Sequence, residues 1–135
     1  MFNLWLRWRK RSRMKTSYFF SNRIRTPGLN LVAISNSYPK KLEWLKSMRR
    51  YPALCPGWEL VKSYKNGDIR QDEYVVAYIE TILDRLDPFQ VYADLGDDAI
   101  LLCWEKPSMK PGLFCHRRIV AEWFCKHLGV KVNEL

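Results

Sequence analysis

The sequence predicts a small α/β domain in three layers, with a short, mostly parallel sheet and helices on its faces. Short apolar runs that favour strands alternate along the chain with segments whose apolar residues recur at helical spacing. The 135-residue chain is 47% hydrophobic and 27% charged, which suits one folded core and argues against extensive disorder. It contains no run of the ~18 apolar residues that a membrane-spanning helix requires.

Each predicted element follows from a local pattern. The fully apolar run 99–104 predicts a strand that is covered on both faces. Further strands are expected at 16–20, 31–34 and 130–132. Helices are expected at 40–50, 58–64, 68–87 and 115–128, with a further turn or helix at 88–95. We expect Asp72 to cap the longest helix and Gly129 to end the last one.

Positive charge is concentrated in the first part of the chain. Residues 1–50 contain 13 Lys and Arg and one acid, a net charge of +12. Residues 51–135 contain 10 bases and 13 acids, a net charge of −3. A basic surface attracts polyanions regardless of their sequence.

Residues 1–13 differ in composition from the rest, so we predict a basic and aromatic extension followed by a single domain at 14–135. The segment is not a secretory signal, because its basic residues follow a short apolar stretch. It could be a tail without a role in the fold, or an interfacial membrane anchor. It could also be a nucleic-acid-binding arm, in which arginines contact phosphates and tryptophans stack on bases. That arm would consist of Trp5, Arg7, Trp8, Arg9, Lys10, Arg11 and Arg13.

Reactive side chains are expected where a strand and a helix meet, because ligands of parallel sheets bind at the carboxyl ends of strands. Cys103 and Glu105 lie at the end of one predicted strand. Cys115 and His116 are expected in the first turn of the next helix, where unpaired N–H groups favour a thiolate. We therefore predict Cys115, Cys103, His116 and Glu105 as catalytic residues, with Arg117 and Arg118 binding an anion.

The cysteines also have a purely structural interpretation, because free cysteines are often buried. Packing in the core is favoured for Cys103, because it lies within a predicted strand, and for Cys55. It is favoured most strongly for Cys125. We expect no metal site, because the chain has no Cys-x-x-Cys pair and His116 directly follows Cys115. No disulfide framework and no cofactor are expected, and a cytoplasmic location is favoured.

Six short strings form a recognisable set: 102–107 (LCWEKP), 114–117 (FCHR), 120–123 (VAEW), 16–18 (TSY), 37–39 (SYP) and 64–67 (YKNG). Together they resemble the domain-of-unknown-function 488 (DUF488) family. The resemblance covers the chain from about Met14 onward. It implies a small α/β domain with two notable cysteines, at the positions of Cys103 and Cys115, and it implies no reaction.

Three functions remain open from the sequence. The first is a thiol and anion site that acts on a nucleotide or another phosphorylated small molecule. The second is non-specific nucleic-acid binding by the arm together with the bases at 23, 25, 40, 41, 49 and 50. The third is an interaction domain whose cysteines only pack. The expected partners are therefore an anionic small molecule or nucleic acid, and the oligomeric state is left open.

Overall fold

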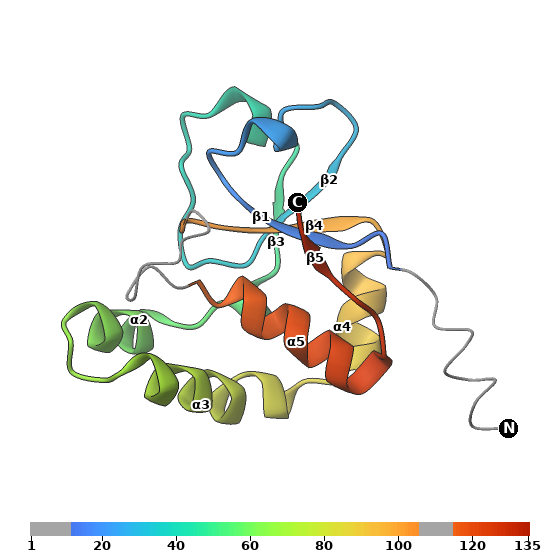
Figure 1. The fold of residues 1–135 in the computed structure, drawn as a ribbon. Coiled ribbons are helices and arrows are strands. Elements are labelled where there is room, and N and C mark those ends of the chain that lie inside the picture. The colour runs from blue at the N-terminus through green and yellow to red at the C-terminus, as the bar shows by residue number, and fades with distance from the viewer. Residues whose placement is uncertain (1–11, 106–114) are drawn as a thin grey trace, which may run out of the picture.

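The computed structural model describes residues 12–105 and 115–135 (Figure 1). Its centre is a five-stranded sheet in the order β3-β2-β4-β1-β5, in which every neighbouring pair is parallel. The strands are β1 (Lys15–Tyr18), β2 (Asn30–Ala33), β3 (Arg49–Arg50), β4 (Ala99–Cys103) and β5 (Asn133–Glu134).

Four α-helices are present in the described residues, and in Figure 1 they lie on one side of the sheet. They are α2 (Trp58–Lys65), α3 (Gln71–Thr81), α4 (Pro88–Leu95) and α5 (Arg117–Leu128). The other face is covered by loops that carry two short 3₁₀ helices, η1 (Asn22–Ile24) and η2 (Glu43–Leu45). The predicted α/β domain with a parallel sheet is confirmed, and 3₁₀ turns form its second covering layer.

The central strand β4 explains why the core has two halves. All five of its residues are buried, and they alternate between the faces of the sheet. Leu101 packs with residues of the helices, whereas Ile100 and Leu102 pack against the loop side. The apolar run in the sequence therefore marks a strand that is covered on both faces, as predicted.

The helix predicted at 40–50 is wrong. The structure has η2 there, followed by the two-residue edge strand β3. Leu42, Leu45 and Met48 are three residues apart, a spacing that suits 3₁₀ turns as well as one face of an α-helix. All three pack into the loop-side core, and the chain then returns to pair with β2.

Two other elements differ in their limits. The predicted helix at 68–87 ends at Thr81 and continues as the 3₁₀ helix η4 (Leu83–Arg85). Its N-cap is Arg70, whose backbone N–H donates to the Glu73 carboxylate (3.0 Å), rather than Asp72. The last strand lies at β5 instead of 130–132, and Val130 and Val132 are buried in the helix-side core.

Folded contacts extend to Ser12, two residues before the predicted start of the domain. The Ser12 hydroxyl lies 2.6 Å from the Tyr92 hydroxyl and accepts the N–H of Met14 (3.0 Å). Arg13 forms an exposed ion pair with Asp97 (3.4 Å). In the described part of the chain, no helix is long and apolar enough to cross a membrane.

Candidate functional site

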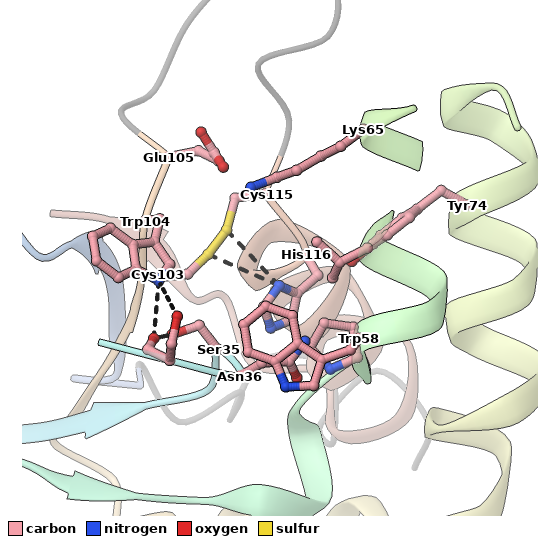
Figure 2. Close-up of a pocket in the computed structure, with 13 residues that line it drawn as sticks. Ser35, Asn36, Trp58, Lys65, Tyr74, Cys103, Trp104, Glu105, Cys115 and His116 are labelled. Atoms are coloured by element: carbon pink, nitrogen blue, oxygen red, sulfur yellow. Dashed lines mark hydrogen bonds between the residues drawn. A yellow bond between two sulfur atoms is a disulfide. The ribbon is translucent and has the colours of Figure 1, made fainter. Parts of the chain in front are cut away.

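A pocket of about 490 Å³ lies where β2, β4, α2, α3 and the start of α5 meet (Figure 2). The residues at 35–37, which follow β2, form one wall, and Cys103 and the two residues after it form another. Two indole rings line the opening, since Trp58 is 65% and Trp104 is 37% exposed. Lys65 of α2 extends toward Cys115.

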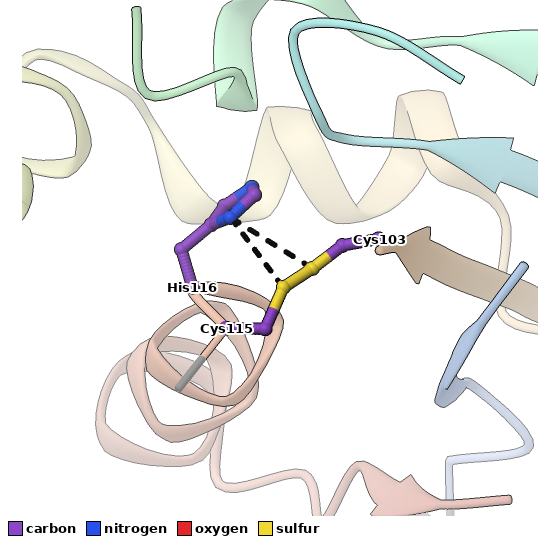
Figure 3. Close-up of side chains that lie close together, drawn as sticks. All are labelled: Cys103, Cys115 and His116. Carbon is purple, nitrogen blue, oxygen red and sulfur yellow. Dashed lines mark hydrogen bonds between the residues drawn. A yellow bond between two sulfur atoms is a disulfide. The ribbon is translucent and has the colours of Figure 1, made fainter. Parts of the chain in front are cut away.

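A disulfide joins the two predicted cysteines at this pocket. Cys103 is the last residue of β4, and Cys115 lies two residues before α5, with Cα atoms 6.9 Å apart (Figure 3). Cys103 is fully buried, whereas Cys115 is half-buried, and both line the pocket. The expectation of unpaired cysteines is therefore wrong for this pair, because a strand end and a helix start bring the two sulfurs together.

His116 is buried beside the disulfide in a defined tautomer. Its Nε2 lies 2.6 Å from the carbonyl oxygen of Ile34, and because a carbonyl only accepts, Nε2 carries the proton. Its Nδ1 lies 3.8 Å from the sulfur of Cys115 and 3.9 Å from that of Cys103. Burial lowers the pKa of His116 to about 4, and the charge of Arg117 acts in the same direction. At neutral pH the ring is uncharged, and Nδ1 presents a lone pair to the sulfurs.

Arg117 also contacts the disulfide, although it does not line the pocket. The guanidinium is buried and forms a two-bond ion pair with the Glu134 carboxylate, at 3.0 and 2.9 Å. Its remaining nitrogen, Nη1, donates to the Glu105 carbonyl oxygen (2.6 Å) and to the Cys103 sulfur (3.6 Å). Arg117 therefore supplies positive charge at Cys103 while its own charge is offset by Glu134.

The two predicted anion-binding arginines are thus engaged within the protein. Arg118 donates to the Thr16 hydroxyl (2.9 Å) and to the Val132 carbonyl oxygen (3.0 Å). Arg117 is bound to Glu134 as described above, and neither arginine lines the pocket. Lys65 is the basic residue of the pocket lining.

The structure brings Cys103, Cys115, His116 and Glu105 together at one pocket. Cys115 and His116 precede α5 rather than lying within its first turn, because the helix begins at Arg117. Trp58, Lys65 and Tyr74 were not assigned to the site from the sequence, although Lys65 lies in the 64–67 (YKNG) string. The residues at 35–37 could have been found, because they follow a strand that neighbours β4 in the sheet.

The other two cysteines are not part of a disulfide. Cys125 is exposed, so the prediction that it packs in the core is wrong. It lies on α5 between the buried Phe124 and the exposed Lys126, on the solvent side of the helix. Cys55 is half-buried with its sulfur 3.2 Å from the Ser35 carbonyl oxygen, and burial raises the pKa of this thiol.

Three metal-ligand atoms converge at this site. The two sulfurs and a ring nitrogen of His116 all lie within 4.8 Å of one another. The adjacency of Cys115 and His116 in the sequence, one of the two reasons for expecting no metal, thus does not keep their donor atoms apart. Of the predicted nucleic-acid arm, Trp5, Arg7, Trp8, Arg9, Lys10 and Arg11 lie outside the described residues, and Arg13 is exposed.

Comparisons with known proteins found no match to this chain. No protein-family model matches it, and neither the curated proteins nor the solved structures contain a significant match. The function therefore has to be inferred from the geometry of the pocket.

Proposed function

We propose that Cys103 and Cys115 form a redox-active pair that carries out thiol–disulfide exchange with a ligand in the pocket. The observation that carries the proposal is the position of this disulfide. It lies in a pocket wall with its half-buried sulfur beside the unprotonated Nδ1 of His116. A disulfide that only stabilises a fold needs neither a pocket nor such a neighbour.

The exposure of the two sulfurs assigns their order of reaction. In the reduced protein, the Cys115 thiol lies beside His116 Nδ1, which can accept a hydrogen bond from it; the thiol loses its proton to solvent, and the resulting thiolate attacks a sulfur of an external disulfide. A protein–ligand disulfide forms, and one ligand thiolate leaves and takes up a proton. The Cys103 thiol, beside Nη1 of Arg117, then loses its proton, and its sulfur attacks the Cys115 sulfur; the second ligand leaves as a thiolate and takes up that proton. Two electrons pass from the protein to the external disulfide.

The pocket offers a small charged disulfide one positive group, Lys65, and one carboxylate, Glu105. Lys65 and the two exposed indoles of Trp58 and Trp104 offer a positive charge and flat apolar surfaces beside the sulfurs. This chemistry is compatible with the anionic ligand expected from the sequence, with Lys65 taking the role that was assigned to Arg117 and Arg118. We also propose that the chain is a member of the DUF488 family, on the strings around Cys103 and Cys115.

The first prediction tests which sulfur reacts. We would replace the exposed Cys125 by Ser throughout, reduce the protein, and add oxidised glutathione as the external disulfide. Without further changes, the protein should release two thiols per chain and regain the Cys103–Cys115 disulfide. A Cys103→Ser variant should stop at a glutathione adduct on Cys115, because the resolving thiol is absent. A Cys115→Ser variant should react far more slowly, because Cys103 is buried.

Mass spectrometry of the trapped adducts provides the measurement. Equal labelling of Cys115 in the Cys103→Ser variant and of Cys103 in the Cys115→Ser variant would contradict the assigned order. Labelling of Cys55 alone, with both site cysteines unreactive, would contradict the proposed function. A Cys55→Ser variant should behave like the parent protein, because Cys55 does not take part in the disulfide.

A further inference from the structure

We propose that the reduced protein binds a zinc-like divalent cation through the sulfurs of Cys103 and Cys115 and Nδ1 of His116. The inference rests on the proposed function only in that the same cysteine pair must be reducible. It adds a ligand class that thiol–disulfide exchange does not require. Thiolate and imidazole donors in this ratio favour zinc over calcium or magnesium.

The distances at the site suit one ion. Tetrahedral zinc with bonds of about 2.3 Å to sulfur and 2.0–2.1 Å to nitrogen holds a sulfur and a nitrogen roughly 3.6 Å apart. The His116 Nδ1 already lies 3.8 and 3.9 Å from the two sulfurs. The sulfurs themselves must move to about 3.8 Å apart once their bond is reduced. Cα atoms 6.9 Å apart allow this movement through side-chain rotation.

The surroundings of His116 fix the ring in the form that a metal requires. The Ile34 carbonyl oxygen accepts the Nε2 proton at 2.6 Å, so Nδ1 is the nitrogen with the free lone pair. Metal-binding histidines commonly donate their second ring nitrogen to a carbonyl or carboxylate in this way. The imidazole is also held in place, because it is buried with its ring 5.3 Å from that of Tyr78.

The backbone explains how two adjacent residues can serve one ion. His116 has φ −63° and ψ −15° at the N-cap of α5, so the chain has already begun to turn into the helix there. Figure 3 shows the Cys115 sulfur and the His116 ring at the N-terminal end of α5, with Cys103 approaching from β4. Their donor atoms therefore face the same point although the residues are neighbours in sequence.

Charge and access also fit this assignment. Two thiolates add negative charge at a buried position, and Arg117 donates to one of them at 3.6 Å. Because all three donor residues line the pocket, a fourth coordination position would face it. Three protein ligands with an open fourth position are the arrangement of catalytic zinc sites, whereas structural sites have four protein ligands.

The second prediction is tested with Co²⁺, a coloured substitute for zinc, added to the reduced full-length Cys125→Ser protein. We expect one equivalent to bind, with a thiolate-to-cobalt charge-transfer band and the visible bands of tetrahedral cobalt. Oxidation of the cysteine pair should abolish these bands. Replacing His116 by Ala should weaken binding by more than about 10-fold, since even loss of a residue that only orients a ligand costs about that much.

A matched control is available on the same helix. His127 is exposed on α5, and a His127→Ala variant should bind cobalt as the parent does. Absence of the cobalt bands in protein whose Cys103 and Cys115 both react as free thiols would overturn the metal site and leave thiol–disulfide exchange intact. Cobalt binding by protein that does not exchange with oxidised glutathione would instead overturn the proposed function and retain the metal site. Equal affinity of the His116→Ala and parent proteins would show that His116 is not a ligand.

Discussion

The uncharged state of His116 links the site to the stability of the fold. The imidazole is buried, so water cannot solvate its charged form, and this burial lowers the pKa of His116 from 6.5 to about 4. Below pH 6.5 the unfolded chain therefore takes up a proton that the folded protein does not. This contribution to stability is present above pH 6.5 and is lost as the pH falls through about 4.

The third prediction concerns the pH range over which this contribution to stability is lost. Between pH 6.5 and 4, the parent should lose roughly 3 kcal/mol more free energy of unfolding than a His116→Gln variant, because 1 pKa unit corresponds to about 1.36 kcal/mol. Denaturant unfolding at a series of pH values, with the cysteine pair oxidised to prevent metal binding, measures the difference. An equal pH dependence of the free energy of unfolding in the parent and the His116→Gln variant would contradict the prediction. A His127→Gln variant should show the same pH dependence as the parent. An NMR titration of His116 in the parent tests the same pKa without relying on a variant.

Single residues also show what the sequence could not predict about the site. The sequence identified Cys103 and Glu105 because they lie at the end of a predicted strand, and Cys115 and His116 because they were expected in the first turn of the next helix. It could not show which way the His116 ring points, because that depends on the Ile34 carbonyl, 82 positions away in the chain. The adjacency of Cys115 and His116 therefore appeared to exclude a metal, whereas the fold directs both side chains to one point.

At the scale of elements, the start of α5 and the last strand depend on each other. Arg117 is buried with a side chain 3% exposed, and the Glu134 carboxylate on β5 is its ionic partner. Glu134 also accepts the hydroxyl of Thr16 on the neighbouring β1 (2.5 Å). This carboxylate therefore joins two strands to the helix that carries the site, and it holds Arg117 beside Cys103.

The fourth prediction concerns this connection. A Glu134→Gln substitution should destabilise the protein by roughly 3 kcal/mol, because it leaves a buried guanidinium without its counter-charge. Since Glu134 is one-quarter exposed, we expect the low end of the range for buried pairs. Thermal unfolding provides the measurement. A Glu122→Gln variant removes the same charge from an exposed position on α5 and should change stability by less than about 0.5 kcal/mol. Equal effects of the two substitutions would contradict a role for the ion pair.

The elements that the sequence predicted well are those whose residues are buried on a regular pattern. The run that forms β4 and the apolar face of α3 are defined by their own side chains. By contrast, β3 is two exposed arginines, Arg49 and Arg50, and exists only because β2 offers an edge to pair with. A strand of this kind has no hydrophobic signature, so it was assigned to a helix.

At the scale of the whole molecule, the sequence predicted the class of fold but not how the layers are distributed. Both faces of the sheet needed a cover, since β4 is apolar throughout. The helices supply one cover, and 3₁₀ turns with Phe19, Ile24 and Leu45 supply the other. Short 3₁₀ segments lack a long periodic pattern, so sequence periodicity alone assigned helices to both faces.

The uneven charge of the molecule leads to the last prediction. The basic residues of 1–50 include Arg7, Arg9, Lys10 and Arg11, outside the described residues, whereas Arg13 pairs with Asp97. If these four bases contact phosphates, each should add about −0.7 to the log–log salt slope for single-stranded DNA. Replacing all four by Gln should reduce the slope by roughly 3 while Trp5 and Trp8 remain to stack on bases.

Fluorescence anisotropy at several salt concentrations measures these slopes, and the described contacts determine which variants to compare. A truncation that starts at Ser12 removes the segment and keeps the hydrogen bond to Tyr92 and the Arg13–Asp97 pair, which are contacts of the first described residues. It should lose the same slope as the four-Gln variant and also the stacking contribution, which makes it the weaker binder of the two. Weak, salt-insensitive binding by the full-length protein would contradict nucleic-acid binding by the arm. Such a result would leave the proposals for the disulfide pocket unaffected, because they rest on Cys103, Cys115 and His116 and not on these bases.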